Sequence, residues 1–329
     1  MAHEVEQMFY YGEEPWHHLG KKVEHALTAE EAIVEAGLDW EVVTAPIYHN
    51  WGGTRVKIED RTAVRRTTDG NVLGIMTPHY VPVQNKDAFK FFDSVTGTGE
   101  AKYHTAGSLR NGRRVWMLAK LNGKGPMSIK GDAVDKYLLL MNGHDGQVAL
   151  KMFFTPVRVV CMNTLTAADV GARRVETFYA KHQGNIAGRM DQAREILGMT
   201  IKFFGAFEEQ ANRLATLQLP PAELPKLLAA AFGTTGAMRV EDVVNLSDFT
   251  STRKEHEMER VQALFEGAGK GLDNPAIKGT KWAAYNAIVE HCDYEKQFRG
   301  KQPEDNRLEY MWLGGGQQVK ARAWAYLNK

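Results

Sequence analysis

Hydrophobic positions in the first half of the chain follow the spacing of strands, with one clear helical interruption. Two apolar stretches, residues 101–109 and 113–121, flank an Asn-Gly turn and predict a β-hairpin. Residues 136–141 and 147–154 predict two more strands on either side of a glycine-containing turn. Between residues 85 and 95, apolar side chains instead recur at spacings of three and four, which predicts a helix.

Nearer the N-terminus the pattern predicts a short helix and a small group of strands. Residues 28–31 form a Thr-Ala-Glu-Glu capping box, which marks the start of a helix. Residues 40–48, 57–66 and 72–76 are strand-like, and the turn at 68–71 joins the last two.

The second half of the chain changes to helical spacing. Thr155-Pro156 predicts a helix start, with Thr155 as the N-cap and Pro156 in the first turn. From about residue 185 we expect helices up to the C-terminus. The expected fold class is α+β, an antiparallel sheet with a β-β-β-α-like core at about residues 85–182, followed by a helical part. Residues 1–183 are expected to form the α+β core domain, and residues 184–329 a mostly helical subdomain.

The distribution of charge adds a functional indication. The 329 residues carry 41 Lys and Arg against 40 Asp and Glu, which excludes a uniformly basic protein. Residues 100–182, however, hold 13 basic and 6 acidic residues, a net charge of +7. A basic segment in a near-neutral chain indicates a local anionic partner, although the same charges would also suit a solvated sheet face.

Several classes of chemistry are excluded by the sequence. It contains no phosphate loop ending in Gly-Lys-Ser/Thr, no dinucleotide fingerprint, no Gly-x-Ser-x-Gly elbow and no His-Glu-x-x-His motif. Two cysteines, Cys161 and Cys292, are too few for a disulfide scaffold. No apolar run reaches the roughly 18 residues of a membrane helix. We therefore expect a cytoplasmic protein with no cofactor, no membrane partner and no catalytic residue.

The predicted hairpin at 101–121 carries the most informative side chains. Arg110, Arg113 and Arg114 crowd its turn, and arginine side chains can fork onto phosphates. On the second strand Arg114 and Trp116 share a face, which places a cation beside a ring able to stack an unpaired base. The alternative is that Trp116 is a core residue and that the arginines only solvate the turn. The candidate nucleic-acid-binding residues are Lys102, Tyr103, Arg110, Arg113, Arg114, Trp116, Lys151, Arg158, Arg173 and Arg174.

A weaker candidate site contains histidines. His104, His144 and Asp145 supply metal-binding or acid–base groups, but no further ligand follows at a fixed spacing. Asp145 also lies in a Gly-His-Asp-Gly sequence, whose residues favour a turn. His17 and His18 are adjacent, so in extended chain they point to opposite faces and do not share one ion.

Short runs spread over nearly the whole chain carry a family resemblance. They include Trp16-His17-His18-Leu19-Gly20, Tyr80-Val81-Pro82-Val83-Gln84-Asn85, Tyr103-His104-Thr105-Ala106-Gly107-Ser108-Leu109, Asn142-Gly143-His144-Asp145-Gly146, Thr155-Pro156-Val157-Arg158-Val159-Val160-Cys161-Met162-Asn163-Thr164-Leu165 and Gly279-Thr280-Lys281-Trp282. In these runs the chain resembles a family of phage- and plasmid-encoded proteins catalogued as the domain of unknown function DUF932. The resemblance implies a phage or plasmid protein of the host bacterial cytoplasm, and it implies no activity.

The order of the predicted elements carries a second, structural resemblance. A helix at 85–95, an antiparallel meander at 101–154 and a helix from Pro156 are similar to the core of single-strand annealing proteins of the Rad-fifty-two, Erf and RecT types. That resemblance implies single-stranded DNA held in a basic groove by a ring or filament of subunits, and annealing without ATP.

Three functional hypotheses follow from these observations. We expect first a single-stranded nucleic-acid-binding protein of the DNA annealing and recombination type, which forms a homo-oligomer; DNA is the expected partner and RNA stays open. The first alternative is an anti-defence or host-interaction protein. The second is a metal-dependent nuclease that uses His104, His144 and Asp145.

Overall fold

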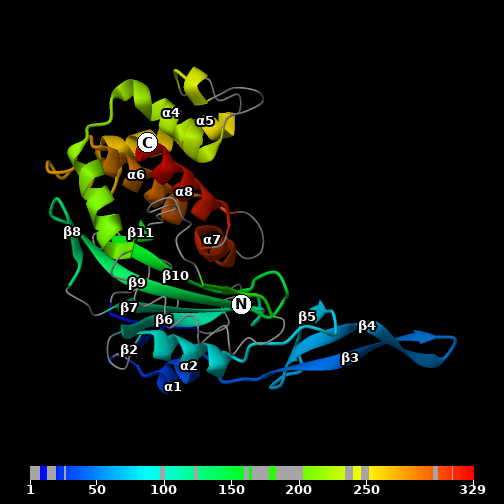
Figure 1. Ribbon diagram of the computed structural model, residues 1–329. Coiled ribbons are helices and arrows are strands. Elements are labelled where there is room, and N and C mark those ends of the chain that lie inside the picture. Colours follow the sequence, from blue (N-terminus) through cyan, green and yellow to red (C-terminus); the bar gives the residue numbers. More distant parts are fainter. Residues whose placement is uncertain are drawn as a thin grey trace. The chain divides into compact units, whose positions relative to one another are not determined.

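The computed structural model describes residues 8–12, 20–25, 27–96, 101–121, 125–158, 163–164, 178–182, 203–233, 240–245, 252–298, 303–312 and 314–329. Within these residues, antiparallel sheets occupy the N-terminal half and helices the C-terminal part, which confirms the expected α+β class (Figure 1). The chain divides into a first unit (Met1–Gly123, Tyr137–Phe154, Glu176–Thr200) and a second unit (Lys124–Lys136, Thr155–Val175, Ile201–Lys329). The predicted boundary at 183 falls outside the described residues and stays a prediction.

The larger sheet is built around the predicted meander. Its strand order is β11-β10-β9-β7-β6-β1-β2, with β8 paired to β9 and β12 paired to β10. The strands are β1 (Met8–Tyr11), β2 (Lys21–Val23), β6 (Ala101–Leu109), β7 (Arg114–Leu121), β8 (Met127–Ile129), β9 (Asp132–Gly143), β10 (Leu150–Arg158), β11 (Asn163–Thr164) and β12 (Phe178–Ala180). Strands β9 and β10 each supply residues to both units.

The hairpin predicted around the Asn-Gly turn is confirmed. Strands β6 and β7 pair antiparallel, from Ala101 opposite Leu121 to Leu109 opposite Arg114. In the turn, Arg110, Asn111 and Gly112 all have positive φ, the backbone conformation that tight hairpin turns require. Residues 114–119 of β7 are all buried, so this strand is covered on both faces and lacks the alternation of a half-exposed sheet.

Two helices of the first unit accompany this sheet on one face (Figure 1). Helix α1 (Ala29–Glu35) begins with the predicted capping box, in which Thr28 Oγ1 accepts from the Glu31 amide and Glu31 accepts from the Thr28 amide. Helix α2 (Asn85–Thr96) lies where the apolar spacing predicts it and buries Phe89 and Phe92. Helix α1 contacts both α2 and β6, which places the two helices in one layer.

The helix predicted from Pro156 is wrong. Strand β10 continues through this residue to Arg158, and Val157 pairs with Thr164 of β11. The fixed φ of proline suits an extended strand as well as a first helical turn, so the Thr-Pro pair is compatible with both. Thr155 and Val157 are β-branched and buried, and their packing favours the strand.

A second, smaller sheet consists of β3 (Val42–Trp51), β4 (Thr54–Arg66) and β5 (Val72–Met76) in that order. The three predicted strands are confirmed, but β3 and β4 run further than expected and meet at a Gly52-Gly53 turn with both φ values positive. Pairing shifts beside Pro46, which lacks an amide donor, so residues 59–61 form a bulge.

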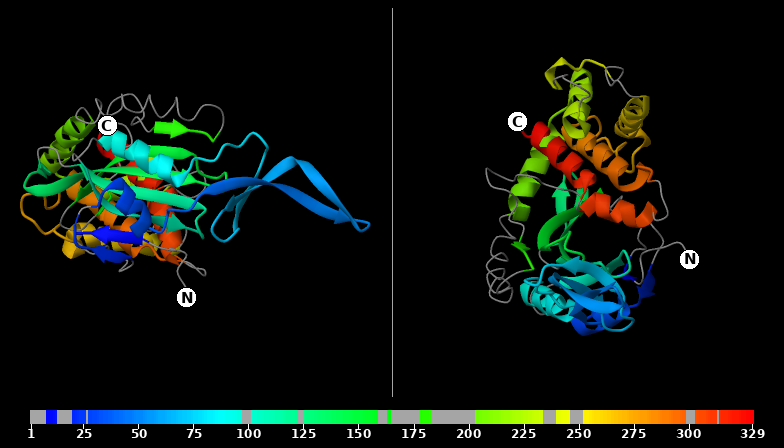
Figure 2. Two further views of the ribbon diagram at one scale, coloured as in Figure 1. Left: turned by 90° about the horizontal axis from the view of Figure 1, so that it is seen from below. Right: turned by 90° about the vertical axis from the view of Figure 1, so that its right-hand side faces the viewer.

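Strand β5 pairs with β4 only over residues 62–65. Residues 47–58 therefore form a ribbon of two strands, with no third strand paired to it among the described residues; we call this ribbon the arm. Figure 1 and the left view of Figure 2 show the hairpin extending away from the strands of the larger sheet.

The second unit is rich in helices. They comprise a helix at 203–216, η1 (Pro221–Glu223), α4 (Leu224–Phe232), η2 (Val240–Asp242), α5 (Thr252–Ala263), η4 (Leu264–Ala268), α6 (Lys281–Glu290), η5 (His291–Glu295), α7 (Pro303–Trp312) and α8 (Gly315–Leu327). Helix α6 is buried from Trp282 onward, and Phe207 stacks on Trp324 with ring centroids 5.0 Å apart. A buried ion pair joins Lys320 to Asp293 inside this unit.

The turn between β9 and β10 generates a first prediction. A β-carbon on Gly143 would lie 2.4 Å from the Val148 carbonyl oxygen, so Gly143→Ala must displace backbone. We expect a loss of about 1–3 kcal/mol in stability. Gly205, in the helix at 203–216, has no atom within 4 Å of such a β-carbon, so Gly205→Ala should be neutral or stabilise by up to about 1 kcal/mol. Thermal unfolding measures both variants, and an unchanged Tm for Gly143→Ala would contradict the close approach.

Candidate nucleic-acid interface

The arm is the most exposed regular element in the described part of the first unit. Every residue from 48 to 57 is exposed, and Trp51 at the tip has 76% of its surface accessible. Residues 47–58 contain no Asp or Glu. Large exposed apolar side chains that gather on one element indicate an interaction site, whereas single ones are ordinary.

The two faces of the arm differ in chemistry. Directly paired residues share a face, which places Tyr48, Asn50, Arg55 and Lys57 together on one side. The Arg55 guanidinium lies 3.9 Å from the centre of the Tyr48 ring, a cation–π contact that covers one face of this ring. A hydrogen bond to Glu59 raises the pKa of Lys57, so this side chain stays charged.

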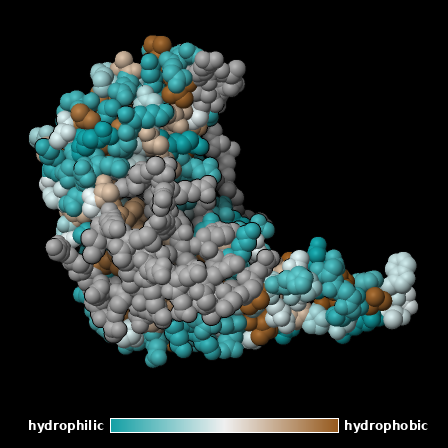
Figure 3. All heavy atoms as spheres, in the orientation of Figure 1, coloured by the Kyte–Doolittle hydropathy of each residue, from teal (hydrophilic) through white to brown (hydrophobic). Residues whose placement is uncertain are grey.

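The opposite face of the arm is mainly apolar. It carries Ile47, His49, Trp51, Val56 and Ile58, of which Val56 is 40% exposed. A two-stranded ribbon buries little surface by itself, so these side chains remain in water unless a partner covers them. Figure 3 shows hydrophobic and hydrophilic residues side by side along the arm.

The aromatic residues predicted to stack bases do not lie at a surface. Tyr103 is 2% exposed and packs on Phe89 of α2, with ring centroids 5.9 Å apart. Trp116 is 1% exposed in the doubly covered strand β7. Burial leaves neither ring a face for a base, and the core alternative for Trp116 is confirmed.

The three arginines of the β6–β7 turn have different environments. Arg114 is 6% exposed, and its Nε donates to Asp145 Oδ2 at 3.2 Å, so this cation serves an internal ion pair. Arg113 is exposed and Arg110 is partly exposed. The β6–β7 turn lies against the base of the β3–β4 hairpin, because a β-carbon on Gly112 would come within 3.3 Å of Arg66, the last residue of β4.

The remaining candidate cations do not form one stripe in the described part of the sheet. Lys102 is exposed and pairs with Lys120 near the start of β6. It lies seven residues, about 23 Å, from the other end of β6, where the turn with Arg110 begins. Lys151 is half-buried in β10. The side chain of Arg158 and the whole of Arg173 and Arg174 fall outside the described residues.

His144 has a structural environment. The ring is fully buried, and its Nε2 donates to Asn85 Oδ1 at 3.0 Å, while the Asn85 amide donates to the Leu38 carbonyl oxygen. Burial lowers the pKa of His144 to about 3, and the charge of His182 acts in the same direction. The imidazole is therefore neutral at physiological pH and joins α2 to the end of β9.

The structure does not bring the three candidate metal ligands together. His104 lies edge-on against Tyr137 at 5.4 Å, and Tyr137 precedes His144 by seven residues along β9, about 23 Å. Asp145 is occupied by Arg114. No group of three His, Cys, Asp or Glu side chains in the described segments is placed to hold a metal ion. His17 and His18 are not among the described residues.

The arm tip is a feature that sequence reasoning missed. The expected strands end at residue 48 and resume at residue 57, which leaves Trp51 in a connecting loop. The available signal is the Gly52-Gly53 pair between β-branched and aromatic residues, a typical two-residue hairpin loop.

Comparison with known proteins identifies the family. The model of DUF932, a domain of unknown function, matches residues 72–312. The chain belongs to this family. No curated protein and no solved structure matches the chain. The matched DUF932 segment begins at β5, so β3 and β4, and with them the arm, precede it. None of the helices in the described ranges is both long and apolar enough to cross a membrane.

The buried His144 generates a prediction about pH. Its pKa of about 3 in the folded protein lies below the usual 6.5, so as pH falls the unfolded chain takes up a proton that the folded protein does not. Stability should therefore decrease on acidification, with about 2 kcal/mol lost through this group between pH 7 and pH 5.

His144→Gln keeps an amide donor for Asn85 and removes the titrating ring. We expect urea unfolding of this variant to depend less on pH than that of the wild type. His49→Gln on the exposed arm is the matched control and should retain the wild-type dependence. Equal pH dependence of His144→Gln and the wild type would show that His144 is not held neutral by burial.

Proposed function

We propose that this protein binds single-stranded nucleic acid and that the arm is its main contact. The observation that carries the proposal is an exposed ribbon, residues 47–58, with two aromatic rings, two cations and no carboxylate. Arg110 and Arg113 add cations in the β6–β7 turn, which lies against Arg66 at the base of the β3–β4 hairpin, eight residues along β4 from the arm.

The chemistry of the arm suits an unpaired strand. Single-stranded nucleic acid is held by aromatic rings that stack on bases and by cations that neutralise phosphates. Trp51 offers an open ring at the tip, and Arg55 and Lys57 offer cations on the opposite face of the ribbon, where Lys57 also forms an exposed ion pair with Glu59. Because any base has a flat face, we expect little sequence preference.

The same proposal includes two further activities. The protein anneals complementary strands without ATP, and it assembles into a homo-oligomer that serves phage or plasmid recombination. Helix α2 followed by the antiparallel strands β6, β7 and β9 supports annealing, because these elements correspond to the first helix and the meander of the annealing-type resemblance. The last element of the resemblance is not found, because residues from Pro156 to Arg158 continue strand β10 where the annealing-type core has a helix.

The arm generates a prediction about affinity. Trp51→Ala should weaken binding of a labelled single-stranded oligonucleotide about 5- to 100-fold, the range expected for one lost stacking contact. Arg55→Gln with Lys57→Gln should lower affinity and reduce the slope of log affinity against log salt by about one to two.

Fluorescence anisotropy over a salt series measures all of these variants. Val244→Ala is the matched control, because Val244 is 65% exposed and belongs to the second unit, not to the arm. An oligonucleotide that binds Trp51→Ala as tightly as the wild type, or no binding at all at low salt, would refute the proposal.

The arginines of the β6–β7 turn generate a prediction that separates binding from folding. Arg113→Ala should weaken oligonucleotide binding with unchanged stability, because Arg113 is exposed. Arg114→Ala should cost about 3–5 kcal/mol, because it leaves the Asp145 carboxylate buried without its partner. Urea unfolding and anisotropy together test the pair, and a fully stable Arg114→Ala would contradict the internal role of Arg114.

A protein partner is the second candidate function, as expected for an anti-defence or host-interaction protein. The apolar face of the arm, with Trp51 and Val56, favours it, because exposed apolar side chains gain free energy when a partner covers them. A bacterial protein retained after nuclease treatment by the wild type, and lost with Trp51→Ala, would favour this function over nucleic-acid binding.

A further inference from the structure

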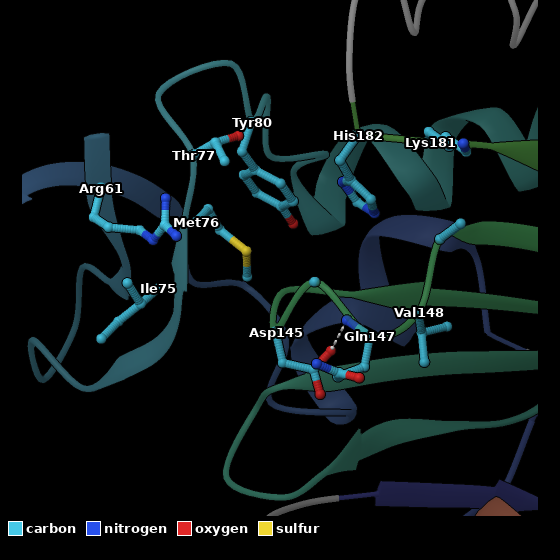
Figure 4. Close-up of a pocket in the computed structure, with 12 residues that line it drawn as sticks. Arg61, Ile75, Met76, Thr77, Tyr80, Asp145, Gln147, Val148, Lys181 and His182 are labelled. Carbon is cyan, nitrogen blue, oxygen red and sulfur yellow. Dashed lines mark hydrogen bonds between the residues drawn. The ribbon is translucent and has the colours of Figure 1, made fainter. Parts of the chain in front are cut away.

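A cavity of about 490 Å³ lies in the first unit, away from the tip of the arm. Its wall is formed by the bulge of β4, strand β5 and the loop after it, the turn between β9 and β10, and the residues after β12. Its size falls within the range of about 300–1,000 Å³ that small-molecule sites occupy. Figure 4 shows Met76, Tyr80, His182 and Asp145 around its centre, with Arg61 on one side and Lys181 on the other.

One wall of the cavity is a stacked pair of rings. Tyr80 and His182 lie with ring centroids 5.0 Å apart and planes 13° from parallel. The Tyr80 hydroxyl donates to the Gly143 carbonyl oxygen at 3.0 Å, which fixes that ring. The Val81 amide donates to the His182 carbonyl oxygen at 2.9 Å, which fixes the backbone beneath the other ring.

His182 supplies an observation that points to a ligand. The residue is only 5% exposed, and neither of its ring nitrogens makes a well-aligned hydrogen bond with the described residues, although the Val81 backbone lies near enough to favour the protonated ring. Burial lowers the pKa of His182, although the Val81 backbone and the Asp145 charge oppose this, so the ring has one donor and one acceptor. Buried polar atoms are almost always paired in folded proteins, and a molecule in the cavity would complete this pair.

Acidic and basic groups border the ring pair. Asp145 is held in place, because Oδ2 accepts from Arg114 and Oδ1 accepts from the Gln147 amide at 2.9 Å. Each oxygen keeps acceptor capacity for a further donor. Arg61 and Lys181, both exposed, bring positive charge to the cavity wall, and Met76 and Val148 make part of it apolar.

We infer that this cavity binds a single nucleotide whose base carries an exocyclic amino group. The base meets His182 edge to edge, with a ring nitrogen accepting from the His182 N–H and its exocyclic amino group donating to Asp145. The phosphate is directed to Arg61, which lies on the opposite side of the ring pair from Lys181 (Figure 4). A nucleotide matches each part of this wall. Its flat base suits the apolar part, the edge of the base suits His182 and Asp145, and its phosphate suits the positive charge. The choice of a nucleotide rests on the proposed function, for which the cavity would hold one unpaired base of a bound strand.

Titration calorimetry of the full chain with AMP, CMP, GMP and UMP tests the inference, with cytidine and inorganic phosphate as separate arms. We expect the three amino-bearing nucleotides to bind at least about 5-fold more tightly than UMP, since one lost hydrogen bond to a charged group has that effect or more. Phosphate alone and cytidine alone should each bind more weakly than CMP.

Two variants assign the binding to the cavity. His182→Phe keeps a ring beside Tyr80 and removes both nitrogens, and we expect about 10-fold weaker CMP binding. Arg61→Gln changes an exposed side chain, so folding is not at risk, and it should weaken CMP while leaving cytidine unchanged. Arg65→Gln, at another exposed arginine of β4, is the matched control for Arg61→Gln and should leave CMP binding unchanged.

The outcomes separate this inference from the proposed function. Three results would overturn the inference, even if oligonucleotides bind through Trp51. They are no binding of any mononucleotide, equal affinity for UMP and CMP, and an affinity for phosphate as high as that for CMP. CMP binding that depends on His182 and Arg61 would support it, even in a chain that binds no oligonucleotide, and the proposed function alone would then fail.

Discussion

The ion pair between Arg114 and Asp145 is the contact on which the first unit depends. Both side chains are at least nine-tenths buried, and such a pair is stable only when its remaining polar atoms find partners. The Gln147 amide supplies one of these partners and closes the turn after β9. The pair thereby joins β7 to that turn, and it places the Asp145 carboxylate in the wall of the cavity.

This internal pair changes how the basic segment at residues 100–182 is understood. A cation that neutralises a buried carboxylate cannot also bind phosphate, so the local charge excess overstates the basic surface of the sheet. Among the described exposed cations that remain in this segment, Arg113 lies in the turn at the base of the β3–β4 hairpin and Lys102 at the far end of β6. Lys130 lies in the β8–β9 turn and Lys181 at the cavity. The arm and the cavity are thus two separate candidate sites in the first unit. Most of the cavity wall falls within the DUF932 match, whereas the arm precedes it.

Local sequence signals predicted local structure well. The Asn-Gly pair predicted the β6–β7 hairpin, the spacing of Phe91 and Phe92 predicted α2, and the capping box predicted α1, because each depends on neighbours within a few residues. The helix predicted from Thr155-Pro156 was wrong because the local preference of this pair suits both a strand and a helix. The packing of Thr155 and Val157, which are both buried, decided for the strand. The arm was only half recognised, because its tip has no periodic apolar pattern beyond Tyr48.

The sequence by itself determined the α+β class, the family and most element positions, which follow from periodicity, turn chemistry and matched motifs. Only the tertiary structure decided which side chains are available for binding. Trp116 and Arg114 have the composition of a nucleic-acid site, yet burial on both faces of β7 removes them from solvent, and no spacing rule reveals a second covered face. His182 shows the converse, because it lies far from Tyr80 in sequence and becomes part of a site only when β12 pairs with β10.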